Sequence, residues 1–222
     1  MCGRFFILDA AGNALLAGIL TAASRRLRAL TGEERVAQGE VFPSAAVAAL
    51  AMGKHGQISA FPMLWGFHRA NGKGLIINTR SESALNHPIF RPSMLVRRCL
   101  IPCSWYFEWE ERTAQQSFSL PSLQIQGKEA PPRRKDILKI KYAIRPKAPG
   151  LMYLAAIYRY EEGQKLPVLS ILTRDASPDI AFIHDRMPVI FTEETRGAWL
   201  DRDADPQKAL SLCEEEMNYR SC

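Results

Sequence analysis

The sequence predicts an α+β protein with a mixed, mostly antiparallel, curled β-sheet that forms a barrel-like core with flanking helices. Three observations support this prediction. Strand-length apolar segments recur along most of the chain and are separated by turn residues. Extended helical periodicity occurs near the N-terminus, and few long helices are expected elsewhere. The 222 residues are 47% hydrophobic and 23% charged, so we expect one core and a single domain over residues 1–222.

The first third of the chain is expected to contain a strand, a helix and a hairpin. Residues 3–8 have the composition of a short strand. Apolar residues recur at helical spacing over 14–30, which predicts a helix facing the core. Residues 39–44 contain a proline and are expected to form a loop. The segments 45–52 and 58–67 flank a turn and are typical of a hairpin.

Further strands are expected in the middle of the chain. A brief buried strand is predicted over 75–78, and 94–109 is expected to be largely extended. Apolar and polar residues alternate over 137–144, which is typical of a half-buried strand. Two more strands are expected over 151–160 and 166–174. The hydrophobic periodicity fades between the segments 94–109 and 137–144, so a loop or hairpin excursion is expected near 111–136.

The last part of the chain is expected to be mainly helical. Residues 178–183 have the pattern of a short helix. A strand is predicted from Pro188 to Phe191, followed by closing helices over 193–200 and 206–216.

The composition argues against a membrane protein, a disulfide-linked protein and a zinc site at Cys99 and Cys103. The apolar runs are too short to span a bilayer and no targeting segment is evident, so we expect a soluble, cytoplasmic protein with no membrane partner. Five cysteines, an odd number, indicate reduced thiols. Cys99 and Cys103 flank an extended segment and would lie about 13 Å apart, too far to share a disulfide or a zinc ion. The net charge of +6 suits a polyanionic partner.

The chain begins Met1-Cys2-Gly3-Arg4, and removal of Met1 would leave Cys2 as the amino terminus. A terminal cysteine carries an α-amine of pKa ~7.7 to 8.0 beside a thiol of pKa ~8.5. The amine can form an imine with an aldehyde, and the thiolate can then close a thiazolidine ring. Retention of Met1 would block this chemistry, because the amine of Cys2 would be acylated. The alternative is that Cys2 is a small apolar residue at the start of a strand.

Other candidate residues lie at the ends of apolar segments. The polar run 78–82 begins with Asn78 and marks either a site or a capped helix start. Glu108 lies between aromatic residues, so it is either exposed on the opposite strand face or kept for acid–base chemistry at a raised pKa. His184 adjoins Asp185 and Arg186, which can set its tautomer and charge.

Taken together, these motifs resemble the SOS-response-associated peptidase (SRAP) family, the abasic-site processing proteins. The resemblance covers nearly the whole chain and rests on four motifs in order: Met1-Cys2-Gly3-Arg4, Asn78-Thr79-Arg80-Ser81-Glu82, Cys99-Leu100-Ile101-Pro102 with Glu108-Trp109, and Ile183-His184-Asp185-Arg186-Met187-Pro188. It implies a monomer without metal or organic cofactor. This monomer would cross-link its terminal cysteine to abasic sites in single-stranded DNA, and would be associated with the nucleoid on damage. Weak lyase activity and self-removal of a leader residue are also implied.

The resemblance assigns roles to ten residues. The implied catalytic residues are Cys2, Asn78, Glu108 and His184. The implied DNA-binding residues are Arg4, Arg80, Arg186, Trp65, Trp105 and Thr173, although core packing is an equal alternative for Trp65. Two features depart from the family pattern. Cys103-Ser104-Trp105 stands where small residues and glycine are common, and the stretch 111–135 is longer than the usual hairpin.

Two other classes of function remain open. N-terminal-nucleophile glutamine amidotransferases also begin Met-Cys-Gly, but this chain has no recognisable glutamine-binding motif and that class leaves His184 unexplained. A non-covalent single-stranded DNA-binding protein would use the basic and aromatic residues without a covalent step.

Overall fold

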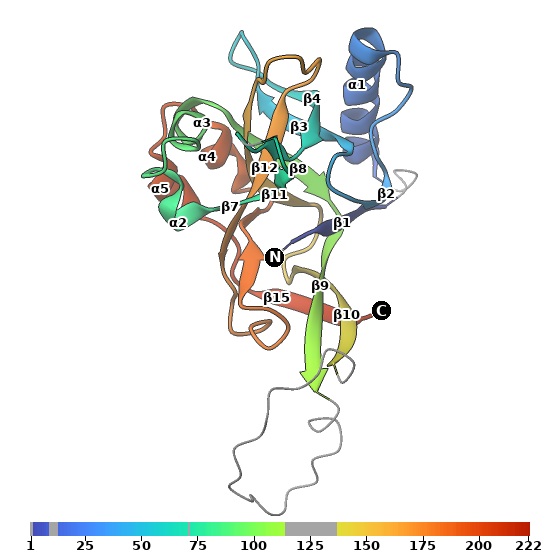
Figure 1. Ribbon diagram of the computed structural model, residues 1–222, viewed down its shortest axis with the longest axis vertical. Helices are drawn as coiled ribbons and strands as arrows, with labels where there is room; N and C mark the ends of the chain where they lie inside the picture. Colours follow the sequence, from blue (N-terminus) through green and yellow to red (C-terminus); the bar gives the residue numbers. More distant parts are fainter. Residues whose placement is uncertain (1, 9–12, 71, 114–136) are drawn as a thin grey trace, which may run out of the picture.

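The computed structural model describes residues 2–8, 13–70, 72–113 and 137–222. Most of its strands pair antiparallel in two curled sheets, and the helices lie at the flanks, so the predicted α+β class is confirmed (Figure 1). The excursion expected near 111–136 falls mainly on residues 114–136, which lie outside the described residues. Within the described chain, no helix has both the length and the apolar character needed to cross a membrane.

The first sheet has five strands in the order β15-β10-β9-β1-β2, and its neighbours pair antiparallel. Its strands are β1 (Arg4–Ile7), β2 (Gly39–Val41), β9 (Trp105–Thr113), β10 (Ile137–Pro146) and β15 (Met217–Ser221). β1 lies between β2 and β9, with Arg4 opposite Phe107 and Phe6 opposite Trp105. The start of the chain is therefore an internal strand.

The second sheet contains a closed ring of strands. β12, β4, β3, β8 and β11 pair in sequence, and β11 pairs again with β12, which confirms a barrel-like core. β12 runs parallel to β4 and β7, and the other pairs are antiparallel. The strands are β3 (Ala46–Met52), β4 (Ile58–Trp65), β7 (Asn78–Arg80), β8 (Arg98–Cys103), β11 (Met152–Arg159), β12 (Val168–Asp175), β13 (Arg186–Pro188) and β14 (Ile190–Phe191). A small hairpin joins β5 (Phe67–His68) to β6 (Leu75–Ile76).

The predicted N-terminal helix is present as α1 (Ala14–Thr31) and packs on β3 and β4. Asn13 caps it by accepting a hydrogen bond from the Leu16 amide at 3.0 Å. Gly32 ends it with φ of 85°, a left-handed conformation that glycine adopts without a steric penalty. The other helices are short: α2 (Ser81–Ala84), α3 (Arg91–Val96), α4 (Arg196–Leu200) and α5 (Pro206–Leu210).

Two tryptophans fill the core. Trp65 and Trp199 have no exposed surface. Each indole N–H donates to a main-chain carbonyl at 3.0 Å, Trp65 to Ile77 and Trp199 to Cys99. These bonds satisfy the single donor of each ring, so both rings are stable in the interior. For Trp65, the core-packing alternative to base stacking therefore holds.

Several local predictions were wrong. Residues 39–41 form β2 instead of a loop, because pairing with β1 satisfies their backbone despite the nearby proline. The extended segment 94–109 begins inside α3. Residues 178–183 form successive turns and not a helix. The last predicted helix, 206–216, ends at Leu210 and gives way to β15, which pairs with β10. All five cysteines are free in the structure.

We expect Trp65→Ala to lower the free energy of unfolding by about 3–5 kcal/mol, because it removes a large, fully buried ring and leaves a cavity. Urea denaturation followed by circular dichroism measures this change. Trp65→Phe is the matched control and should cost less, since it keeps most of the ring volume. An unchanged unfolding midpoint for the alanine variant would contradict the core position.

Candidate active site

Cys2 lies where the two sheets meet. It directly precedes β1 of the first sheet and has no exposed surface. Asn78, at the start of β7 in the second sheet, donates from Nδ2 to the Cys2 carbonyl at 2.9 Å. The Cys2 thiol lies 3.8 Å from the carbonyl oxygen of Arg4. The hydrogen bond from Asn78 holds the backbone of Cys2 through its carbonyl oxygen. The α-nitrogen of Cys2 takes no part in this bond.

Glu108 lies on β9 close to Cys2. Arg4 pairs with Phe107, so the next position of the antiparallel register sets Glu108 beside Gly3. Only 3% of Glu108 is exposed. Burial raises the pKa of its carboxyl group and outweighs the neighbouring interactions that lower it. A carboxyl group that keeps its proton above its ordinary pKa can serve as a general acid.

The Cys2 thiol is held in its neutral form. Burial raises the pKa of the thiol strongly, and the negative charge of Glu108 raises it further. A negative charge on Glu108 therefore disfavours a thiolate at Cys2. A reaction at this site needs a proton acceptor for the thiol, and Glu108 is the carboxylate whose charge acts on it.

His184 precedes β13 and has two neighbours at the same ring nitrogen. Its Nδ1 accepts from the Arg186 amide at 2.9 Å and lies 2.7 Å from Asp185 Oδ1. The first contact needs an unprotonated Nδ1, whereas the second needs a protonated one. The Arg186 amide is fixed by β13, while 85% of the Asp185 side chain is exposed. We therefore assign the neutral ring with its proton on Nε2, from the hydrogen-bond network.

A pocket of about 480 Å³ opens beside β9 where β1 begins. It is lined by Gly3, Arg4, Glu108, Trp109, Glu111, Lys139 and His184. Three of the predicted site residues thus share one cavity: Arg4, Glu108 and His184. The cavity combines two acids, an imidazole, an aromatic ring and two cations, which suits a sugar with a flanking phosphate.

Arg4 is positioned by aromatic rings as well as by charge. Its guanidinium carbon lies 4.8 Å from the centre of the Phe42 ring and 4.9 Å from that of Trp109. Its Nη1 lies 3.3 Å from Glu40 Oε1. The side chain remains 41% exposed, so it is accessible to an anion at the pocket mouth.

Lys139 is a pocket residue that the sequence analysis did not identify. Its Nζ lies 2.7 Å from Glu111 Oε1, and the two residues are opposite each other on β10 and β9. The alternation of 137–142 already placed Lys139 on one strand face. Its partner strand could not be found from that pattern, since 114–136 intervene in the chain.

Arg186 has contacts that differ from those expected of a phosphate ligand. Its guanidinium, 8% exposed, lies 2.6 Å from Glu82 Oε1 and 2.5 Å from Asp175 Oδ1. It also donates to the Thr173 carbonyl at 2.8 Å. Thr173 itself is fully buried in β12. These contacts join α2, β12 and β13, so Arg186 supports the loop that carries His184. The role of Arg186 and Thr173 in DNA binding stays a prediction.

The remaining predicted residues lie outside the pocket. Arg80 is exposed at the end of β7, two residues from Asn78. Trp105 lies on the face of β9 opposite to Glu108, because side chains alternate along a strand. It stacks on Phe6, with ring centres 4.7 Å apart. Among the described residues, no group of three or more His, Cys, Asp or Glu side chains is placed to hold a metal ion.

Arg186→Gln should lower the free energy of unfolding by about 1–3 kcal/mol, because it leaves Glu82 and Asp175 without their cation. This loss is smaller than the loss expected when a fully buried ion pair is broken, because the carboxylates of Glu82 and Asp175 are exposed to solvent. Urea denaturation measures the change. Arg25→Gln, at an exposed position on α1, is the charge-matched control and should be neutral. Equal midpoints for the two variants would exclude the framework role.

Glu108→Gln should make the full chain more stable than wild type above pH 4.5, the ordinary pKa of the carboxyl group. Below that pH the carboxyl is protonated in both folded and unfolded states, so it adds no penalty. As pH rises further, the unfolded carboxyl ionises freely while the buried one resists, and wild-type stability declines. Denaturation between pH 4 and 8 measures the difference, and a difference independent of pH would refute the raised pKa.

Comparison with known proteins gives a consistent result. The family model described as SOS response associated peptidase (SRAP) matches residues 1–221. The abasic site processing protein YobE of Bacillus subtilis (strain 168) is 31% identical over 141 residues, covering 62% of this chain and 54% of YobE. The abasic site processing protein HMCES of Gallus gallus is 28% identical over 149 residues, covering 64% of this chain and 43% of HMCES. The matched region thus spans about half the length of these curated relatives.

Solved structures agree on the fold. A crystal structure of a protein from Bacteroides thetaiotaomicron has a TM-score of 0.69 at 19% identity, covering 99% of this chain and 91% of that one. A phage-related protein from Bordetella bronchiseptica gives a TM-score of 0.64 at 17% identity, covering 100% and 94%. With a family model that matches nearly every residue, the chain belongs to the SOS response associated peptidase (SRAP) family.

Proposed function

We propose that this protein processes abasic sites in DNA by covalent capture, with Cys2 as the mature amino terminus. The observation that carries the proposal is the position of Cys2, which Asn78 fixes next to buried Glu108 at a pocket that also contains Arg4 and His184. The names of the curated relatives, abasic site processing proteins, support the same substrate. Single-stranded DNA is the proposed form, because its lesion can enter a pocket without unpairing.

The covalent step requires an aldehyde and both nucleophiles of Cys2. An abasic sugar in its ring-opened form supplies the aldehyde. The free amine of Cys2 adds to it, and the resulting carbinolamine loses water to give an imine. The thiol sulfur then adds to the imine carbon, while the thiol proton passes to the imine nitrogen. Aldehyde, amine and thiol thus become a thiazolidine and one water.

Glu108 and His184 are suited to the proton transfers. Glu108 keeps its proton more readily than an exposed glutamate, so it can protonate the hydroxyl that leaves the carbinolamine. As a carboxylate it can then accept the thiol proton and return it to nitrogen. His184, with its proton on Nε2, can protonate the sugar oxygen as the ring opens. Asn78 orients the Cys2 backbone without adding charge.

Cations around the pocket would hold the DNA backbone. Arg4 and Lys139 line the pocket and remain partly exposed, and Arg80 is exposed near Asn78. Trp109 offers an aromatic surface for the sugar or an adjacent base. The imine can also undergo β-elimination, which would give weak lyase activity. Cleavage of the bond before Cys2 by the same residues would account for a peptidase activity.

The proposal predicts a covalent adduct that depends on Cys2. After incubation with a single-stranded oligonucleotide that carries one abasic site, the Met1-free protein should gain the oligonucleotide mass less one water. The adduct should survive heating, because the ring traps the imine. Cys2→Ala should give no heat-stable adduct. Glu108→Gln should form it about 10²-fold or more slowly, since a general acid typically contributes 10²–10⁴. Intact-mass spectrometry measures each result and reports whether Met1 is present.

An oligonucleotide with an intact base at the same position is the control and should give no adduct. If Met1-free wild type gains no mass, the covalent proposal fails. Binding that is equal for wild type and Cys2→Ala would then favour the non-covalent DNA-binding alternative. Cys2-dependent release of ammonia from glutamine would favour the amidotransferase alternative.

A further inference from the structure

The five-stranded sheet has one face that carries most of its cations and both of its tryptophans, here called the outer face. Residues directly opposite each other on paired strands share a face. Arg4 is opposite Phe107, Trp109 is opposite Lys141, and Arg220 is opposite Ala143, which defines this face across four strands. By the same registers it also carries Phe6, Trp105, Lys139, Arg145 and Asn218.

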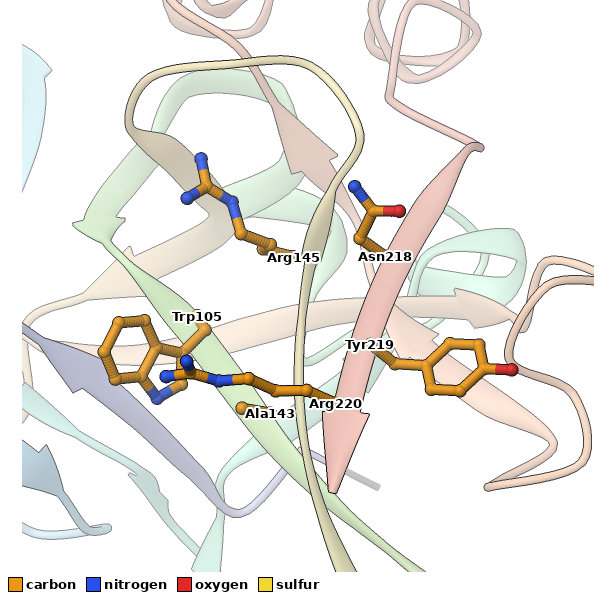
Figure 2. A pocket seen from close by; sticks show the side chains of 6 residues that line it. All are labelled: Trp105, Ala143, Arg145, Asn218, Tyr219 and Arg220. Atoms are coloured by element: carbon orange, nitrogen blue, oxygen red, sulfur yellow. The ribbon is translucent and has the colours of Figure 1, made fainter. Parts of the chain in front are cut away.

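A second pocket lies on the outer face, away from Cys2. It has a volume of about 220 Å³ and is lined by Trp105, Ala143, Arg145, Asn218, Tyr219 and Arg220. Figure 2 shows the side chains of Arg145, Asn218, Trp105 and Arg220 around one hollow, whereas the ring of Tyr219 points away from it. None of the lining residues is acidic. The function proposed above does not use this pocket.

The two arginines of the pocket have no acidic partner among the described residues. On the same face, Arg4 and Lys141 share Glu40, and Lys139 pairs with Glu111. Arg145 instead donates to the Gly150 carbonyl at 2.9 Å. Arg220 lies over the Trp105 ring, 5.3 Å from its centre. Two arginines without an acidic partner among the described residues therefore line one pocket, an arrangement that favours an anion.

The other polar groups of the pocket are mainly donors. The Trp105 indole N–H is buried and has no acceptor within the described part of the chain. Asn218 adds a side-chain amide, which is exposed on β15. These donors, together with the two guanidinium groups, suit the oxygens of a phosphate. The chemistry of the pocket therefore indicates a phosphate group as the ligand.

The outer face of β9 leads from this pocket to the pocket that Glu108 and His184 line. Trp109 lines that pocket and Trp105 lines the second, and the two residues are four positions apart on β9, or about 13 Å. Lys141 lies between them, with its Nζ 3.7 Å from the centre of the Phe107 ring and 5.8 Å from that of Trp109. A DNA strand covers this distance in about four nucleotides or fewer.

We propose that the pocket around Trp105, Arg145 and Arg220 is a second anchoring site for the DNA strand, which binds a backbone phosphate a few nucleotides from the captured lesion. The inference rests on the proposed function, because it takes the abasic strand as the ligand. The site lengthens the DNA footprint along the outer face and makes capture more efficient when the strand continues past the lesion on one side.

The test compares long and short abasic oligonucleotides. Each set carries the lesion next to one end and extends by one to eight nucleotides on the 5′ or the 3′ side. For wild type at a protein concentration below saturation, the rate of adduct formation should rise as the oligonucleotide is extended on one side of the lesion. In the double variant Arg145→Gln/Arg220→Gln this gain should fall about 10-fold. The slope of the logarithm of the binding constant against the logarithm of the salt concentration should become shallower by about 0.7 per lost phosphate contact. Arg25→Gln, an exposed arginine on α1, should keep the full gain.

The outcomes separate this inference from the proposed function. An unchanged length gain in the double variant, with a wild-type unfolding midpoint, overturns the second site while adduct formation still supports covalent capture. Absence of adduct with every oligonucleotide overturns covalent capture instead. In that case, fluorescence anisotropy with an undamaged single strand still tests the pocket. A reduced salt slope in the double variant supports it, and an equal slope overturns it.

Discussion

The pairing of β1 on both sides is the constraint on which the site depends. A chain terminus is ordinarily the part of a protein that frays most easily. Here the first strand is bonded to β2 and β9, and Leu8 and Phe6 also bond to Ser104, where the chain passes from β8 into β9. This double pairing sets Cys2 at the junction of the two sheets, where Asn78 reaches its carbonyl.

Burial favours the neutral forms of the candidate reactive groups, whereas the arginine that supports the site keeps its charge. Cys2 and Glu108 are buried, and burial favours their neutral forms. Arg186, by contrast, keeps its charge because Glu82 and Asp175 surround it. The ion pairs fix β13 and the backbone N–H that sets the His184 tautomer. A charged framework thus orients a site whose buried groups favour their neutral forms, which suits the proton transfers proposed for it.

Local pattern predicted those parts of the molecule that depend on nearby residues. The periodicity of α1 was readable from the sequence, and burial of Glu108 was one of the two alternatives that its aromatic neighbours indicated. β2 and β15 were missed because each is stabilised by a strand far away in the chain, as Met217 is by Pro146. The ion pairs of Arg186 were missed for the same reason, and its role in DNA binding stays a prediction. Its motif indicates a cation near a histidine, while its acidic partners Glu82 and Asp175 are contributed by other elements.

The alternation of β9 gives one short segment two roles. Tyr106 and Glu108 point inward to Cys2 and the core, whereas Trp105, Phe107 and Trp109 form the outer face. A carboxyl group needs burial to hold its proton, and a nucleic-acid surface needs aromatic rings beside cations. One strand meets both needs because successive side chains point in opposite directions. The proposed reaction site and the proposed strand-binding surface are therefore fixed relative to each other by the backbone of a single strand.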